Sequence, residues 1–251
     1  MVKIICATVV VSMMFVVAGC KPKTAEESLS IGVELGAKGD WSGALKMAQR
    51  AESLSANNVP ALILCAVANE KLGERDQALD VARKAAAQNP ESFIAQYTLG
   101  RLYATDPTRY SDALSPLTRA AKLCDFKDKN TLVLLSNITV ALRSPSAGNW
   151  LTHLARTAPD MVNNAAFRNS MGIVRAQSGK LDLAKKEFTS AYGLDRSNPT
   201  VLYNIATFFD RYASNRRAAT QFYQAFLRLA GDDANYAELK SNATTRLAQL
   251  R

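Results

Sequence analysis

His153 is the only histidine in this chain of 251 residues, so any Ser–His–Asp or Cys–His site would have to use it. No nucleophile elbow or cysteine-centred catalytic motif accompanies it. The glycines form no phosphate-binding loop, and Asp232-Asp233 is typical of a helix cap rather than of a metal site. We therefore expect a half-buried structural histidine, no catalytic residue, no metal, no cofactor and no enzyme activity. An enzyme that uses His153 is the alternative.

A cysteine near the amino terminus offers a different chemistry. Lys3 precedes an uncharged apolar run, Ile4–Ala18. The end of this run forms the sequence Val17-Ala18-Gly19-Cys20 together with the next two residues. Fifteen apolar residues suit the core of a signal peptide, because a relaxed membrane span needs roughly 20. Small residues directly before a cysteine resemble the lipobox of bacterial lipoproteins. The resemblance implies a signal peptide over residues 1–19, lipidation (with palmitate among the acyl chains) at Cys20, and a tether over residues 20–28. A plain secretory signal is the alternative.

This predicted anchor decides where the folded part would lie. Acyl chains on Cys20 would hold it at the periplasmic face of the bacterial cell envelope, and Lys21 resembles the residue found in outer-membrane lipoproteins. The chain carries 31 Lys and Arg against 22 Asp and Glu, a formal charge of +9, with the excess concentrated in residues 168–228. Outside the cytoplasm such a charge favours acidic protein surfaces, anionic lipid or polysaccharide over nucleic acid. A solvated convex face explains it equally well.

Small residues recur through the rest of the chain at a spacing of about 34 residues. They form three series: Gly32, Ala66, Gly100, Gly172 and Ala206; Ala44, Ala78, Ala113, Ala184 and Ala218; and Ala51, Ala85, Ala120, Ala191 and Ala225. A fixed period of this length indicates stacked helical hairpins, in which small residues let two helices cross closely. One extra residue in the turn at residues 104–107 explains why the third repeat falls one place late.

The period divides the chain into three parts and a cap. Residues 25–127 hold three hairpins, 128–164 a degenerate one with a break at residues 144–148, and 165–232 two more. Residues 233–251 predict a capping helix with one apolar stripe: Tyr236, Leu239, Ala243, Leu247 and Leu250. Pro116 would remove a backbone hydrogen bond from the interior of a helix, so we expect a helix that begins there or is kinked there. Cys65 and Cys124 lie in neighbouring repeats at different heights, which favours two thiols over a disulfide.

These features resemble the tetratricopeptide repeat. Gly32, Gly39, Trp41, Ala44 and Ala51 satisfy its motif in the first repeat, while Arg75 and Ala213 depart from it in the second and sixth. The resemblance implies an all-α, right-handed α-solenoid of about six hairpins plus the cap, in which the first helix of each hairpin lines a concave groove. The groove positions it implies are Ile63, Val67, Tyr97, Arg101, Asn169, Ile173, Tyr203, Thr207, Asp210 and Arg211, joined by Val133 and Asn137 if the degenerate unit keeps register.

A lining of apolar, amide and tyrosine side chains suits an extended or helical peptide segment. The leading hypothesis is a membrane-anchored scaffold or adaptor that binds another cell-envelope protein in its groove, in pilus or secretion-system assembly. The alternative is direct binding of peptidoglycan or polysaccharide through Tyr97, Tyr203 and the late basic residues.

Overall fold

The computed structural model describes residues 22–250, so Cys20 and the predicted signal peptide lie outside the described residues. Those residues form thirteen α-helices joined by turns and three short 3-10 helices, with no strand among them. The helices are α1 (Ala25–Ala37), α2 (Trp41–Leu54), α3 (Val59–Lys71), α4 (Arg75–Gln88), α5 (Phe93–Ala104), α6 (Tyr110–Leu123), α7 (Lys129–Ala141), α8 (Ala147–Thr157), α9 (Ala165–Gln177), α10 (Leu181–Leu194), α11 (Pro199–Arg211), α12 (Arg216–Ala230) and α13 (Ala237–Gln249).

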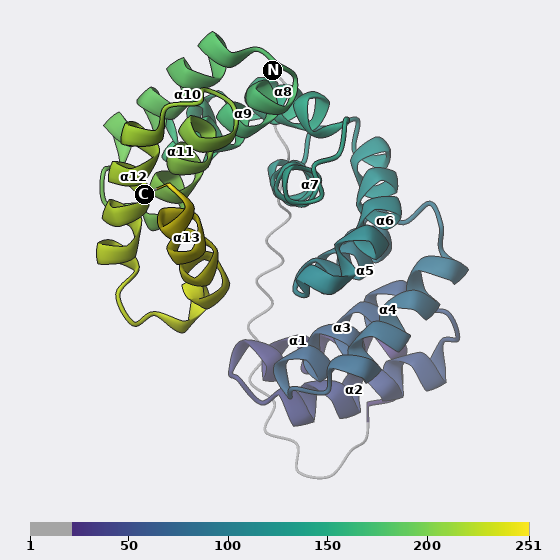
Figure 1. Cartoon of the computed structure of the whole chain (residues 1–251). Coiled ribbons are helices and arrows are strands. Elements are labelled where there is room, and N and C mark those ends of the chain that lie inside the picture. The colour runs from purple at the N-terminus through teal and green to yellow at the C-terminus, as the bar shows by residue number, and fades with distance from the viewer. Residues whose placement is uncertain (1–21, 251) are drawn as a thin grey trace.

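Consecutive helices pair as hairpins, from α1 with α2 to α11 with α12, and the hairpins follow one another around an arc (Figure 1). In the middle of the arc α5, α7 and α9 lie on its inner side and α6, α8 and α10 on its outer side. Residues 22–250 therefore form an all-α solenoid of six helical hairpins, as the repeat predicted. Helix α13 follows as the cap and lies on the inner side of the C-terminal arm.

The small residues of the period lie where the two helices of a hairpin cross. A Cβ added to Gly100 would lie 2.5 Å from Cγ of Leu117, and one added to Gly172 would lie 2.8 Å from the Phe188 ring. The alanines of the second series are fully buried in the first three hairpins and the fifth: Ala44, Ala78, Ala113 and Ala184. Close approach of the helices is thus the physical reason for the repeat.

The sixth hairpin departs from this register. Ala219 and Phe226 are fully buried on α12, whereas the expected Ala218 and Ala225 are only half-buried. The turn before α12 is one residue longer than the turn of the fifth hairpin, which rotates the helix by one position. That turn uses Ser214 in the left-handed region (φ 49°), where hairpins one, two and five use glycine.

The position of Pro116 corrects another expectation. Helix α6 begins at Tyr110 and continues through Pro116 to Leu123, so a helix start at Pro116 is wrong. The missing proline N–H leaves the carbonyl of Asp112 without its helical partner. Asp112 lies on the exposed first turn of α6, where water can take the place of that donor.

The degenerate unit is a hairpin of α7 and α8. Helix α8 begins at Ala147, so the expected break at residues 144–148 is shorter than predicted, and the segment 159–163 that follows the helix forms a 3-10 helix. His153 is half-buried and stacks on Phe126, with ring centroids 4.5 Å apart. This histidine therefore packs in the junction between the third and fourth hairpins.

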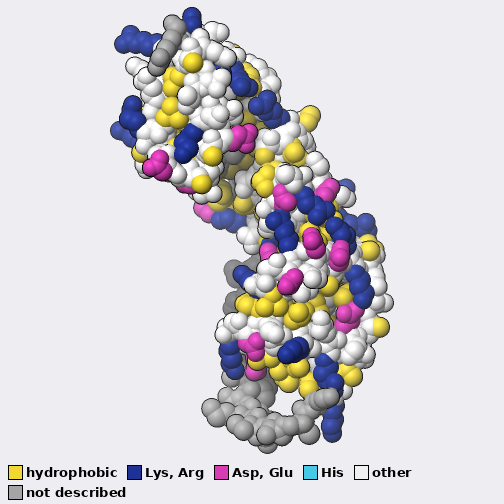
Figure 2. All heavy atoms as spheres, turned by 60° about the horizontal axis from the view of Figure 1, so that its bottom comes forward, with side chains coloured by type: hydrophobic (Ala, Val, Ile, Leu, Met, Phe, Trp, Pro, Cys, Tyr) yellow, Lys and Arg dark blue, Asp and Glu magenta, His cyan; other side chains and the backbone are white. Residues whose placement is uncertain are grey.

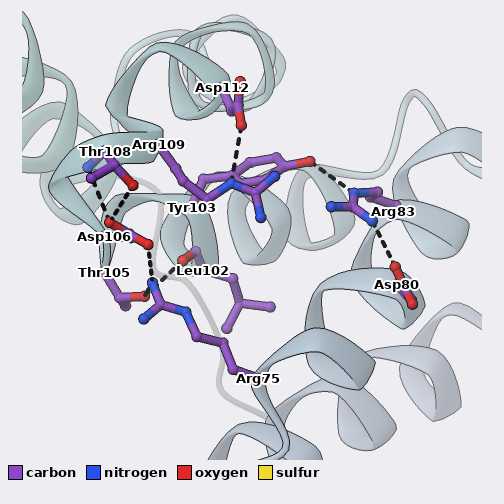
Figure 3. A network of polar contacts seen from close by, with 10 residues as sticks. All are labelled: Arg75, Asp80, Arg83, Leu102, Tyr103, Thr105, Asp106, Thr108, Arg109 and Asp112. Carbon is purple, nitrogen blue, oxygen red and sulfur yellow. Dashed lines mark hydrogen bonds and ion pairs between the residues drawn. The ribbon is translucent and has the colours of Figure 1, made fainter.

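A polar network joins the second and third hairpins on the side of the longer turn (Figure 3). Arg75 donates to the Thr105 hydroxyl at 2.8 Å and lies 3.5 Å from the Asp106 carboxylate. The Tyr103 ring lies between two arginines: Arg83 donates to its hydroxyl at 2.9 Å, and the Arg109 guanidinium covers its face at 4.5 Å. Arg75, which departs from the repeat motif, therefore has a structural role: it contacts the longer turn of the third hairpin.

The cap and the two thiols complete the core. The stripe of α13 packs on the last hairpin, with Ala243 fully buried against a cluster that includes Tyr223 and Phe226. Cys65 is buried within α3, and Cys124 is half-buried at the end of α6. Both are free thiols.

Candidate functional site

Two hollows lie among the residues that the repeat geometry places on the concave side. The first, called here the N-terminal groove, has a volume of about 550 Å³ and lies between the first helices of hairpins one to three. Its lining contains only apolar residues, among them Leu29, Val33, Trp41, Ile63, Val67 and Ile94. The predicted Ile63 and Val67 lie together on this wall of α3, one helical turn apart.

The N-terminal groove leaves large apolar side chains in water. Val33 is 55% exposed and Ile94 is 43% exposed, although their neighbours on the same helices are buried in hairpin contacts. Apolar surface gathered in one hollow favours burial against a second apolar surface, at roughly 25 cal/mol per Å² covered. This arrangement can hold the apolar face of a peptide segment.

Next along the concave side lie Tyr97 and Arg101 on α5. The Tyr97 ring stacks on Phe93 with centroids 5.8 Å apart, and partial burial raises the pKa of its phenol. Arg101 donates two hydrogen bonds, of 2.8 and 2.6 Å, to the carboxylate of Glu70 on α3. These bonds lower the pKa of Glu70, so the pair is ionised and joins two hairpins. Arg101 is therefore engaged within the protein.

The second hollow, called here the C-terminal pocket, has a volume of about 360 Å³ and lies between α7, α9, α11 and α13. It brings together four predicted residues: Ile173, Tyr203, Thr207 and Arg211. Arg143, from the turn after α7, and Leu239, from the capping helix, complete the lining together with Tyr212. No Asp or Glu lines this pocket.

Two predicted residues are held by internal contacts instead. Asn169 is buried and accepts a hydrogen bond from the side chain of Asn204 at 3.2 Å. Asp210 is paired with Arg246 of the capping helix and accepts a further bond from the hydroxyl of Tyr223. In the degenerate unit Val133 is half-buried and Asn137 exposed, and both line a smaller hollow between α7, α8 and α9.

Counting repeat positions predicts some, but not all, of the residues that line the N-terminal groove and the C-terminal pocket. Val33 occupies in the first repeat the position that Val67 holds in the second, so the same counting predicts it. Arg143 and Leu239 lie outside the groove positions of the repeat, in the turn of the degenerate unit and in the cap. Only the three-dimensional arrangement brings them to the concave side.

Charge on the molecular surface is mixed. The face seen in Figure 2 shows Lys and Arg side chains interspersed with Asp and Glu around the middle of the molecule. Within residues 22–250, no group of three or more His, Cys, Asp or Glu side chains could hold a metal ion. No helix in that range combines the length and apolar composition needed to cross a membrane.

Comparison with known proteins identifies the fold. Similar solved structures include YrrB, described as a TPR protein with an unusual peptide-binding site (TM-score 0.60, 20% identity, 79% of this chain and 97% of that one). A tetratricopeptide repeat protein from Parabacteroides merdae gives a TM-score of 0.68 at 14% identity, over 91% of this chain and 90% of that one. PilW, described as a widely conserved type IV pilus biogenesis factor, gives 0.60 at 13% identity, over 89% of this chain and 100% of that one.

The sequence itself has no such match. No protein-family model matches the chain, and no curated protein is significantly similar to it. The structural likeness at these low identities establishes a tetratricopeptide repeat fold.

Proposed function

We propose that this protein of tetratricopeptide repeat fold is a membrane-anchored scaffold that binds a peptide segment of another cell-envelope protein along its concave side. The observation that carries the proposal is the N-terminal groove, a wholly apolar hollow that leaves Val33 and Ile94 in water. The segment that fits it presents an apolar face, as one side of an amphipathic helix does. Solved structures of similar fold include one described as peptide-binding and one described as a pilus biogenesis factor, which supports this class of function.

The envelope location rests on the lipoprotein-like sequence before Cys20. Pro22, two residues later, is already tied to the fold, since Arg50 donates to its carbonyl oxygen at 2.8 Å. A chain of two residues spans at most about 7 Å. Acyl chains on Cys20 would therefore hold the first hairpin, and the groove beside it, against the membrane surface. Partners in pilus or secretion-system assembly would meet the protein there.

Photo-crosslinking in native envelopes tests the proposal. A photoreactive residue at Ile94 should capture one discrete protein, and the capture should fall when Val33→Glu places a charge in the groove. The same residue at Leu183, 40% exposed on α10, serves as the control and should not capture that protein. Equal capture from Ile94 and Leu183, or capture that Val33→Glu leaves unchanged, contradicts groove binding.

Glycan binding is separated by a sedimentation assay with purified peptidoglycan. Tyr97 would provide the ring for such a ligand, but one face of it already stacks on Phe93. Sedimentation that is lost in Tyr97→Ala and retained in Val33→Glu would replace the scaffold proposal with glycan binding.

A further inference from the structure

We propose that the C-terminal pocket binds an Asp or Glu side chain of the partner segment, together with an adjacent apolar side chain. This inference rests on the proposed function, because it identifies the chemistry of the segment that lies on the concave side. It is carried by two arginines, Arg143 and Arg211, that line a pocket without carboxylates.

Arg143 and Arg211 differ from three other arginines that are held by a carboxylate. Among residues 22–250, Arg101 pairs with Glu70, Arg168 with Glu187 and Arg246 with Asp210. Within the same range, neither Arg143 nor Arg211 makes a side-chain hydrogen bond or an ion pair. A guanidinium group offers five N–H donors in a planar fork that matches a carboxylate. The donors of both residues are thus available to a ligand.

The two carboxylates that adjoin lining residues in the sequence, Asp210 before Arg211 and Glu187 before Phe188, already have charged partners. Asp210 precedes Arg211 directly, but its side chain is 3% exposed and is held by Arg246. Glu187 on α10 pairs with Arg168 and Arg175, at 2.9 and 3.2 Å. Arg211 helps to lower the pKa of Asp210 through its charge, but neither carboxylate forms an ion pair with Arg143 or Arg211, so an anionic ligand complements the pocket.

The turn that places Arg143 at the pocket has a left-handed backbone. Arg143 has φ 52°, in the left-handed region, and occupies the hairpin turn that hairpins one, two and five build with Gly39, Gly73 and Gly179. A residue with a Cβ is strained there by roughly 1–2 kcal/mol, and glycine is not. The fourth hairpin thus holds a strained arginine at a position where glycine would be more stable.

The remaining walls of the pocket determine which side chain can bind next to the acidic residue of the peptide. Ile173 and Phe208 form an apolar side of the pocket, and Leu239 closes it from the capping helix. The amide of Gln177 adds a polar group at the same wall. An acidic residue beside a Leu, Ile or Phe fits this combination of two guanidinium groups and an apolar wall.

Selection from a phage-displayed library of short random peptides tests the inference on the full chain. The wild type should enrich peptides with Asp or Glu next to an apolar residue. The R143Q/R211Q double variant should lose that acidic preference and bind the best acidic peptide about tenfold more weakly or worse. R217Q/R228Q removes the same charge from exposed residues of α12 and should behave as the wild type.

Arg143→Gly separates binding from folding. It relieves the left-handed strain, so it should melt at or above the wild-type temperature while binding the acidic peptide more weakly. A Glu→Gln change in the selected peptide should have the same effect on binding, and amidation of the peptide's carboxyl terminus should have none.

Several outcomes overturn the inference. They are an acidic preference that survives in R143Q/R211Q, an equal loss in R217Q/R228Q, or binding that depends on the peptide's terminal carboxylate instead. If the wild type enriches apolar peptides without acidic residues and loses them in Val33→Glu, the scaffold proposal holds and this inference fails. If the wild type enriches no peptide, both fail.

Discussion

Arg246 of the capping helix donates two hydrogen bonds, each of 2.8 Å, to the carboxylate of Asp210 on α11. The pair joins residues 36 positions apart, and the Asp210 side chain is almost completely buried while Arg246 is partly exposed. Asp210 occupies a groove position of the repeat, yet its charge holds the cap that supplies Leu239 to the C-terminal pocket. The ion pair therefore holds the capping helix to α11, the helix that lines the C-terminal pocket.

The pair predicts an asymmetry between two substitutions. Arg246→Gln leaves a buried carboxylate without its charged partner, whereas Asp210→Asn removes the buried charge itself. Both variants should melt several degrees below the wild type at neutral pH, and Arg246→Gln should melt lowest. Thermal melts followed by circular dichroism measure the difference. An Arg246→Gln variant with the wild-type melting temperature would show that the cap is held by its apolar stripe alone.

The same pair makes stability depend on pH. The hydrogen bonds from Arg246 hold the pKa of Asp210 below its ordinary value of 3.8. Because the folded-state pKa is the lower one, the stabilisation is fully present above pH 3.8 and is lost as pH falls through the folded-state pKa. The difference in unfolding free energy between wild type and Asp210→Asn should therefore be constant near neutrality and shrink below about pH 4. Urea titrations at a series of pH values test this, and a difference that grows on acidification would contradict it.

The hairpins were predictable from sequence because each crossing imposes a small residue at a fixed spacing. Where a turn changes length, the spacing alone does not predict which residue lies at the crossing. Ala218 was expected at a crossing, but the longer turn around Ser214 buries Ala219 instead. Arg75 departs from the repeat motif, and only its contacts to Thr105 and Asp106, which the three-dimensional arrangement of the two turns creates, explain that departure.

The candidate site was predictable only in part, for a related physical reason. Repeat positions indicate which residues face the concave side, but they do not indicate which of those residues are already paired. Arg101 and Arg211 occupy groove positions alike, yet only Arg101 has a carboxylate partner among the described residues. The decisive information lies in contacts between helices that are far apart in sequence.

The crossings predict opposite effects for the same substitution at different glycines. Gly100→Ala would place a Cβ 2.5 Å from Leu117, and the resulting overpacking should destabilise the fold by about 1–3 kcal/mol. A Cβ added to Gly193, within α10, would meet no atom of another helix within 4 Å, so Gly193→Ala should stabilise by roughly 0.5–1 kcal/mol through helix propensity. Denaturant unfolding of the two variants measures both values. Equal effects at the two sites would contradict the crossing argument.

The two thiols of the folded part should differ in reactivity. Burial raises the pKa of the Cys65 thiol to about 11, and the side chain is almost inaccessible. Cys124 is half-buried at a helix end. In the native protein near pH 8, a maleimide should label Cys124 and leave Cys65 unmodified until the protein unfolds. Mass spectrometry of the labelled peptides assigns the sites, with Cys124→Ser as the control. Rapid labelling of Cys65 in the folded protein would show that α3 opens far more readily than its packing implies.

The lipid anchor gives the last prediction. If Cys20 carries the acyl chains, Cys20→Ala should block maturation, remove palmitate labelling and release the folded part from the membrane fraction. Cys124→Ser is the matched control, because it also removes one thiol but leaves the predicted lipobox intact. Metabolic labelling with palmitate and fractionation of the envelope measure both effects. A Cys20→Ala protein that remains in the membrane fraction would mean that another part of the chain, or its partner, holds it there. In that case the N-terminal groove need not lie at the membrane surface, and the partner should be sought without that constraint.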